Sequence, residues 1–177
     1  GGNNLTNDIS IGLRAPQAEA EKIKKKFGTC LTSDISSDET IEVPGMGGRA
    51  PRKLPRQILG EILEPRLEEI FELTYREIYR ARMENAINSG IVLTGGTSLL
   101  DGVAEVAESI FNLPTRLGKP QGIKGLVDVV NNPMYATGVG LVLFAARHRD
   151  SKKFRIRDKN IFNRVMTRMK RWFQEVV

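Results

Sequence analysis

Ile91-Val92-Leu93-Thr94-Gly95-Gly96-Thr97 is the stretch of the sequence that says most about the fold. Its three aliphatic residues predict a short buried strand, and the threonines and glycines predict a tight turn into a helix. The apolar residues of 100–111 recur at helical spacing, so we expect that helix there. A strand, a glycine turn and a helix in this order are typical of an α/β domain.

The turn could also hold a ligand. Gly95 and Gly96 would let a ligand approach the backbone, and the start of a helix favours a phosphate or another polar group. A tight turn would need the same glycines with no ligand, so both interpretations stay open. The turn is not a Walker loop, because no Gly-Lys-Ser/Thr follows, and it is not a GxGxxG fingerprint.

Two helices are expected before the turn. The first covers residues 5–13 with Thr6 or Asn7 as its cap, because leucine and isoleucine recur there at four-residue spacing. The second begins at Pro16 and ends at Gly28. We expect its lysines on a solvated face: Lys22, Lys24, Lys25 and Lys26.

The remaining elements follow from residue type and spacing. Residues 29–48 predict strands and loops, and residues 54–87 predict the longest helical stretch. Pro65 inside that stretch should kink or divide the helix, because proline lacks a backbone donor. Residues 115–117 predict a strand, and the small and apolar residues of 134–146 predict a buried helix.

The positive charge is concentrated at the C-terminal end. Residues 151–177 hold 9 of the 27 Lys and Arg and 2 of the 21 Asp and Glu, a net charge of +7, whereas residues 1–150 carry 18 and 19, a net charge of −1. Such a basic segment is typical of proteins that bind anionic lipid or nucleic acid. Residues 147–160 are polar and charged, and we interpret them as a linker.

Residues 161–177 predict an amphipathic helix that lies on an anionic membrane surface. At the α-helical angle its apolar side chains share an arc of roughly 140°, opposite a basic face. Nucleic acid would not need the apolar stripe, and the charged linker argues against docking on the chain's own domain. The predicted membrane residues are Ile161, Phe162, Val165, Met166, Met169, Trp172 and Phe173, with the basic Arg164, Arg168, Lys170 and Arg171.

Other features limit the function classes. The single cysteine, Cys30, excludes an internal disulfide and suits a reducing cytosol. No run of about 18 apolar residues and no signal peptide is seen, so we expect no membrane-spanning segment. The first residue is glycine, and we expect the chain to be the C-terminal part of a longer protein. His148 is expected at the surface, and we find no candidate general base and no catalytic or metal-binding residue.

Segments along the whole chain, in order, resemble the FtsA family. These are the bacterial cell-division members of the actin and Hsp70 ATPase superfamily. The set is highly specific, although each segment alone is not. The segments are Gly1-Gly2-Asn3-Asn4-Leu5-Thr6-Asn7-Asp8-Ile9, Ala20-Glu21-Lys22-Ile23-Lys24, Gly47-Gly48-Arg49-Ala50-Pro51-Arg52, Glu64-Pro65-Arg66 and Ile91-Val92-Leu93-Thr94-Gly95-Gly96.

The resemblance implies half of an actin-like (ribonuclease H-like) α/β ATPase domain. We expect residues 1–15 and 88–146 to form part of subdomain 2A, and residues 16–87 to form an inserted α+β subdomain 2B. The linker 147–160 and the C-terminal amphipathic helix 161–177 would follow.

The resemblance also implies the adenosine half of an ATP site. Glu21 would accept a bond from a ribose hydroxyl, and the lysines would contact adenine and ribose. The two Asp/Gly/Thr phosphate loops of the superfamily are not found in this sequence, so Mg²⁺ would be held mostly by a preceding part. We therefore expect weak or no ATP binding by this chain alone, and at most slow ATPase activity. The expected nucleotide residues are Glu21, Lys24, Lys25, Gly28, Gly95, Gly96 and Thr97.

A group of basic residues lies within 49–66, and arginine recognises carboxylates in a fixed geometry. The resemblance implies that subdomain 2B binds the acidic, apolar C-terminal tail of FtsZ. Arg66 would be the first contact, with Arg52, Lys53 and Arg56 around it. Solvated charge balanced by nearby glutamates is an equally open interpretation.

The leading hypothesis is therefore an adaptor that anchors FtsZ filaments to the cytoplasmic face of the bacterial inner membrane at the division septum. Self-association, later division proteins and anionic lipids are expected partners, and nucleic acid is not. The alternatives are another actin-like scaffold of the PilM or MreB type, and a kinase of the same superfamily. A kinase would have no use for a basic amphipathic C-terminus.

Overall fold

The computed structural model describes residues 1–45, 47–83, 86–123 and 127–148. The chain divides into two compact units, Gly1–Val139 and Gly140–Val177. Apart from residues 147 and 148, the predicted linker and the predicted membrane helix lie outside the described residues, so both stay predictions. The predicted division of the first unit into subdomains 2A and 2B also stays a prediction.

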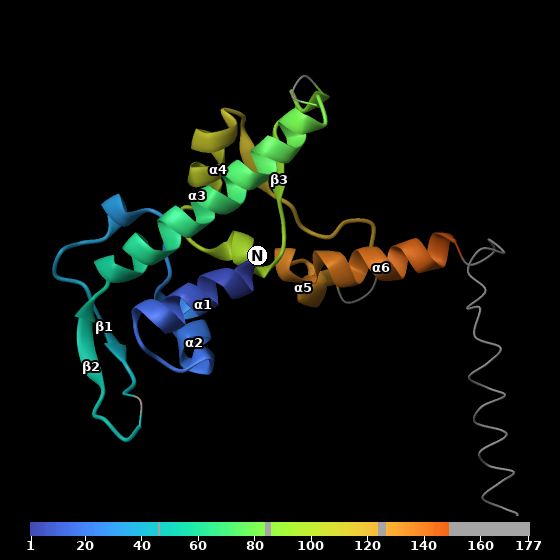
Figure 1. Cartoon of the computed structure of the whole chain (residues 1–177). Coiled ribbons are helices and arrows are strands. Elements are labelled where there is room, and N and C mark those ends of the chain that lie inside the picture. Colours follow the sequence, from blue (N-terminus) through green and yellow to red (C-terminus); the bar gives the residue numbers. More distant parts are fainter. Residues whose placement is uncertain (46, 84–85, 124–126, 149–177) are drawn as a thin grey trace, which may run out of the picture. The chain divides into compact units, whose positions relative to one another are not determined.

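Helices form the centre of the first unit. Helix α1 (Gly2–Gly12) packs against α2 (Gln17–Phe27) and α3 (Gln57–Arg80) (Figure 1). Leu5, Ile9 and Leu13 are fully buried, as their four-residue spacing predicted. The predicted cap of α1 is wrong: the helix begins at Gly2, three residues before the predicted start, with Gly1 as its N-cap, so Thr6 and Asn7 lie inside it.

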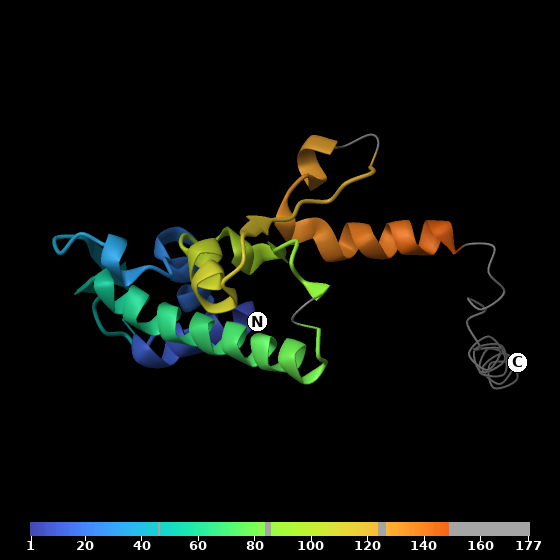
Figure 2. The same cartoon turned by 90° about the horizontal axis from the view of Figure 1, so that it is seen from above.

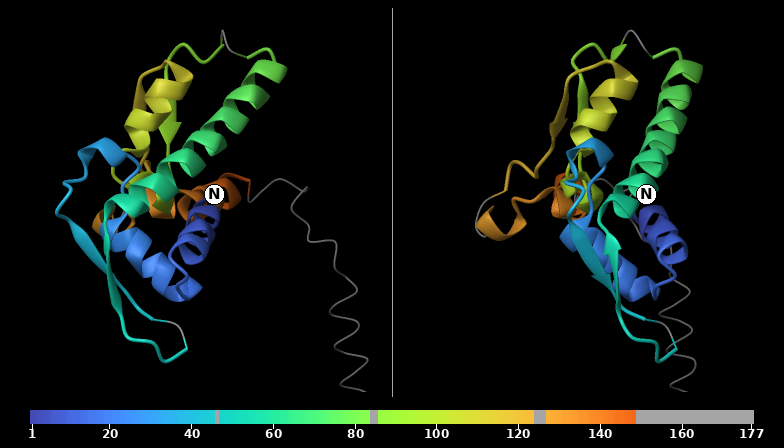
Figure 3. Two further views of the ribbon diagram at one scale, coloured as in Figure 1. Left: turned by 60° about the vertical axis from the view of Figure 1, so that its left-hand side comes forward. Right: turned by 90° about the vertical axis from the view of Figure 1, so that its left-hand side faces the viewer.

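Helix α2 has the predicted limits, with Pro16 before it and Gly28 after it. A short 3-10 helix, η1 (Thr32–Asp34), leads from there to an antiparallel hairpin of β1 (Thr40–Val43) and β2 (Arg52–Pro55). Ile41 and Val43 are buried and mark the inner face of this hairpin. Figure 3 shows the hairpin extending past α1 and α2.

Helix α3 continues unbroken through Pro65, so the predicted division there is wrong. Its buried stripe, which includes Leu63 and Leu67, lies on both sides of the proline and packs against α1 and α4. This burial holds the helix together although proline removes one backbone donor. Farther along α3, Phe71 forms an edge-to-face contact with Phe111 of α4 at 5.7 Å between ring centroids. Figure 2 shows α3 and α4 side by side.

The predicted strand, turn and helix are present as β3 (Ile91–Leu93), the 3-10 helix η3 (Gly96–Leu99) and α4 (Val103–Phe111). Strand β4 (Thr115–Leu117) pairs with β3 in parallel, as a strand at 115–117 predicted. The expectation of a buried β3 is wrong in part. Ile91 and Leu93 pack against the core, but Val92 points to the opposite face and is 51% exposed.

The last described elements are α5 (Val127–Val130), η4 (Pro133–Tyr135) and α6 (Ala136–Arg147). The predicted helix over 134–146 is confirmed, but the prediction that it is buried is wrong, because α6 has no buried residue. Its apolar composition had suggested burial, yet composition does not fix what a helix packs against. His148 is exposed, as predicted, and its ring stacks on Phe144. No helix among the described residues is long and apolar enough to cross a membrane.

Candidate functional site

A cavity of about 480 Å³ lies where the start of α1, the middle of α2 and η3 meet. Five of the seven expected nucleotide residues line it, although they come from segments more than 70 residues apart: Glu21, Lys24, Lys25, Gly96 and Thr97. Gly2, Asn3, Leu99, Leu100 and Met134 complete the lining. The fold therefore brings together most of the predicted set, while its role in binding a nucleotide stays a prediction.

Lys24 is buried, so the prediction that it lies on a solvated face is wrong. Its Nζ donates to Glu21 Oε2 at 2.6 Å, to Thr6 Oγ1 at 2.7 Å and to the Gly2 carbonyl oxygen at 3.1 Å. A lysine ammonium has three N–H donors, so these partners use all of them. Lys24 follows the buried Ala20 by four residues, and this spacing could have indicated the buried face. The ammonium ties α2 to the first turn of α1.

Glu21 is the acidic group of the cavity. Its Oε2 accepts from Lys24 and from the Thr6 hydroxyl, and its Oε1 accepts from Lys25 at 3.2 Å. Burial alone would raise the pKa of Glu21, but the hydrogen bonds from Lys24, Thr6 and Lys25 outweigh it and lower the pKa from 4.5 to about 2. Glu21 is therefore ionised at neutral pH, and it lines the cavity as a carboxylate.

The side chain of Lys25 is far more exposed than that of Lys24. Its side chain is 72% exposed, and Glu21 is its one ion-pair partner among the described residues. A lysine of this kind can turn toward a ligand without losing a buried contact. Lys25 therefore suits ligand binding, whereas Lys24 suits support of the site.

The backbone conformation of the turn explains why one of its residues, Gly95, is a glycine. Gly95 has a φ of +96°, where only glycine is free of strain, and its N–H donates to the Pro133 carbonyl at 3.0 Å. Gly95 lines a smaller neighbouring cavity of about 230 Å³, whereas Gly96 lines both.

The other glycines near the site are explained by packing. Gly28 is not part of the lining, and a Cβ there would clash with the Lys24 carbonyl oxygen and touch Leu100. Its expected approach to a base stays a prediction. Sequence reasoning missed Gly2 and Thr6. A Cβ on Gly2 would clash with the Thr97 hydroxyl, and Thr6 meets Glu21 only after α1 and α2 have packed.

The four expected partner-binding residues do not gather in one place. Arg66 binds Asp8 of α1 through Nε and Nη2 and Glu69 of α3 through Nη1. Arg56 pairs with Glu39 at 2.6 Å and donates to the Phe27 carbonyl.

The two hairpin residues of the set lie on opposite faces of β2. Arg52 lies opposite Val43, on the inner face, and donates to the Leu13 carbonyl at the end of α1. Lys53 lies opposite Glu42, on the outer face. None of Arg52, Lys53 and Arg56 lines the cavity beside Arg66.

Comparison with known proteins identifies the family. A family model described as "Cell division protein FtsA" matches residues 1–140. The chain belongs to the FtsA family. It is 44% identical to the FtsA of Pseudomonas aeruginosa over 98% of this chain, 40% identical to that of Escherichia coli K12 over 80%, and 38% identical to that of Bacillus subtilis over 84%. It spans 43%, 35% and 32% of those relatives, less than half of their length.

Solved structures show the same type of fold. MreB5 of Spiroplasma citri bound to ADP superposes with a TM-score of 0.64 and 19% identity, covering 86% of this chain and 46% of that one. The same protein bound to AMPPNP gives a TM-score of 0.63, with 84% and 44% coverage. The fold is therefore actin-like.

Proposed function

We propose that the protein is a membrane-tethered, actin-like, ATP-binding adaptor. It anchors FtsZ filaments to the cytoplasmic face of the bacterial inner membrane at the division septum and recruits later division proteins. The observation that supports this most strongly is the FtsA family match over residues 1–140. That match also favours an adaptor over the kinases and the PilM- or MreB-type scaffolds of the superfamily.

The cavity at Glu21 is the proposed adenosine half of the ATP site. The ionised Glu21 would accept bonds from ribose hydroxyls, and the exposed Lys25 would contact the nucleotide. Gly96 and Thr97 would carry the backbone beneath the base. The related MreB5 structures contain ADP and AMPPNP, which supports a nucleotide as the ligand. Mg²⁺ would be held mostly by a preceding part of the protein, and ATP would favour self-association into filaments more than rapid turnover.

The proposed membrane anchor is the basic amphipathic segment 161–177. Each basic residue near an anionic surface contributes about 1 kcal/mol, so a single helix binds reversibly. Many copies on one filament would bind firmly through avidity.

The proposed FtsZ contact uses basic residues of the 49–66 region. It is tested by fluorescence anisotropy of a labelled FtsZ C-terminal tail peptide titrated with this chain. We expect saturable binding that weakens as salt rises, because charge pairs are screened. A matched peptide with Asn and Gln in place of Asp and Glu should bind much more weakly. Absence of binding by the acidic peptide at low salt would reject this part of the function.

A further inference from the structure

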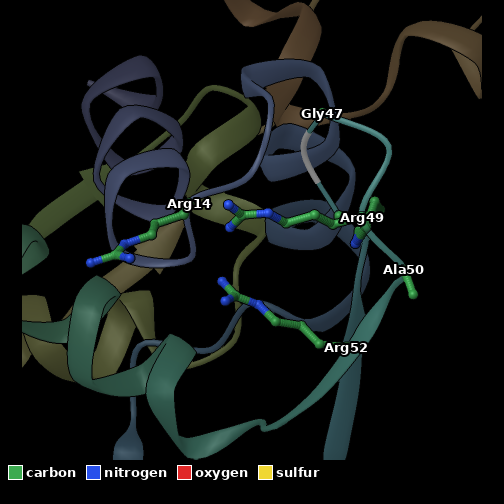
Figure 4. Close-up of a pocket in the computed structure, with 7 residues that line it drawn as sticks. Arg14, Gly47, Arg49, Ala50 and Arg52 are labelled. Carbon is green, nitrogen blue, oxygen red and sulfur yellow. The ribbon is translucent and has the colours of Figure 1, made fainter.

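Two cavities of similar volume differ in how their charged groups are held. One, of about 490 Å³, lies between the end of α1 and the β1–β2 hairpin (Figure 4). Its charged lining side chains are Arg14, Arg49 and Arg52, and in Figure 4 the guanidinium end of Arg14 points away from the other two. In the cavity at Glu21, by contrast, the charged groups share one hydrogen-bond network, which includes the hydroxyl of Thr6. The proposed function gives that hydroxyl no role.

Thr6 lies inside α1, and its side chain is buried although its hydroxyl is polar. The residue is 4% exposed, and its Oγ1 accepts a hydrogen bond from Lys24 Nζ at 2.7 Å. The hydroxyl also lies within donating distance of two oxygen atoms, Glu21 Oε2 and the Gly2 carbonyl oxygen at 3.0 Å. A hydroxyl has one hydrogen to donate, so the two oxygens compete for it. The carboxylate is charged and is the stronger acceptor, so the hydrogen goes to Glu21.

A threonine inside a helix does not need a bond of this kind. Its hydroxyl ordinarily donates to the carbonyl four residues earlier, as Thr74 of α3 does at 2.8 Å. Thr6 has that acceptor in the Gly2 carbonyl. The hydrogen bond to Glu21 therefore goes beyond what α1 itself requires.

Thr6 holds Glu21 from a different element. The other donors to this carboxylate, Lys24 and Lys25, belong to α2, the helix that carries Glu21. A donor on the same helix moves with the carboxylate, whereas the Thr6 hydroxyl is fixed by α1. The Glu21 side chain is 34% exposed and lines the cavity, so without such a hold it would sample several rotamers. Thr6 itself is not among the described residues that line the cavity, so it can act on a ligand only through Glu21.

We infer that Thr6 is a positioning residue of the cavity, and that its hydroxyl fixes the Glu21 carboxylate in the place where it accepts bonds from ribose hydroxyls. The inference rests on the proposed adenosine site and adds a residue to it. A carboxylate that is held before the ligand arrives loses less conformational entropy on binding, which raises the affinity. The competing explanation is that Thr6 only packs α1 against α2. In that case its hydroxyl would affect stability but not the choice of ligand.

The test measures nucleoside affinities of the full chain by NMR chemical-shift titration, with millimolar adenosine and 2′,3′-dideoxyadenosine as probes. Adenosine carries the two ribose hydroxyls that Glu21 would bind, and the dideoxy compound lacks both. Thr6→Val removes the hydroxyl and keeps the branched shape, so it should weaken adenosine binding about fivefold and change the dideoxy affinity less than twofold. Thr6→Ala also removes the hydroxyl, leaves no apolar group in its place and should give the same result. Thr6→Ser keeps the hydroxyl and should bind both nucleosides as the wild type does.

Thr74→Val is the matched control, because it removes a helical hydroxyl whose described bond stays within its own helix. It should leave both affinities unchanged. A second readout needs no ligand: the pKa of Glu21, followed by carbon NMR of its carboxyl group. The Thr6 hydrogen bond helps to lower that pKa to about 2, so Thr6→Val should raise it and Thr6→Ser should not. An unchanged Glu21 pKa in Thr6→Val would overturn the inference.

The inference and the proposed site fail in different ways. A wild-type chain that prefers adenosine to 2′,3′-dideoxyadenosine, with the same preference in Thr6→Val and Thr6→Ala, would overturn the inference and leave the adenosine site standing. Equal losses for the two nucleosides in these variants would also overturn it, because Thr6 would then support packing alone. A wild-type chain that binds the two nucleosides equally, or binds neither, would overturn both proposals.

Discussion

Lys24 and Lys25 are adjacent lysines that pair with the same glutamate, and we expect opposite consequences when each is replaced by methionine. Lys24 is buried and loses three hydrogen bonds, to Glu21, Thr6 and Gly2, whereas Lys25 is mostly exposed and loses one ion pair. Breaking a fully buried ion pair costs about 3–5 kcal/mol. Because the Glu21 side chain is 34% exposed, we discount the loss in Lys24→Met to about 2 kcal/mol. Lys25→Met should cost less than about 0.5 kcal/mol.

Thermal unfolding followed by circular dichroism measures this difference. For a chain of this size, about 2 kcal/mol corresponds to a fall of roughly 4–8 °C in melting temperature for Lys24→Met. Lys25→Met should change it by less than about 2 °C. Equal shifts for the two variants, or no shift for Lys24→Met, would refute the assignment of Lys24 as the support of the cavity.

Three further results are expected. Gly28→Ala should lower the free energy of unfolding in urea by about 1–3 kcal/mol, because its Cβ meets the Lys24 carbonyl; Gly138→Ala, with nothing within 4 Å, should not lower it. Because folding lowers the pKa of Glu21 from 4.5 to about 2, the ionised Glu21 adds to the free energy of unfolding above pH 4.5, and this contribution is lost as the pH falls toward about 2. Thr6→Val removes one of the hydrogen bonds that lower this pKa, so its urea midpoint should fall less over the same pH range. Trp172→Ala should reduce flotation with phosphatidylglycerol vesicles several-fold.

Local sequence signals predicted the elements well. The spacing of Leu5, Ile9 and Leu13 reports which face of a helix is buried, and Pro16 and Gly28 fix the limits of α2 through backbone constraints alone. The strand, turn and helix around Gly95 were likewise predictable, because a φ of +96° needs glycine.

Features that depend on packing between distant segments were not predictable. The contact of Lys24 with Gly2 and Thr6 exists only because α1 and α2 lie side by side. Pro65 was expected to kink or divide the helix, but residues buried on both sides of it belong to one unbroken helix, α3. The exposure of Val92 depends on which elements cover each face of β3, and the residues of the strand alone do not determine this.

The positions of the basic residues of 49–66 in the fold were likewise not predictable from the sequence. Sequence proximity suggested one cluster, yet the alternation of β2 sends Arg52 and Lys53 to opposite faces. Arg66 lies farther along, on α3, beside Asp8 of α1. Arg14 comes to Arg52 only through the fold, because 38 residues separate them in the sequence.

The proposed link between FtsZ and the membrane is tested most directly by flotation of FtsZ with phosphatidylglycerol vesicles in the presence and absence of this chain. A chain with glutamine at Arg164, Arg168, Lys170 and Arg171 serves as the control and should leave FtsZ in the bottom fraction. With the wild-type chain, FtsZ should float, and it should stay at the bottom when the chain is omitted. FtsZ that remains at the bottom while the wild-type chain itself floats would contradict the adaptor function.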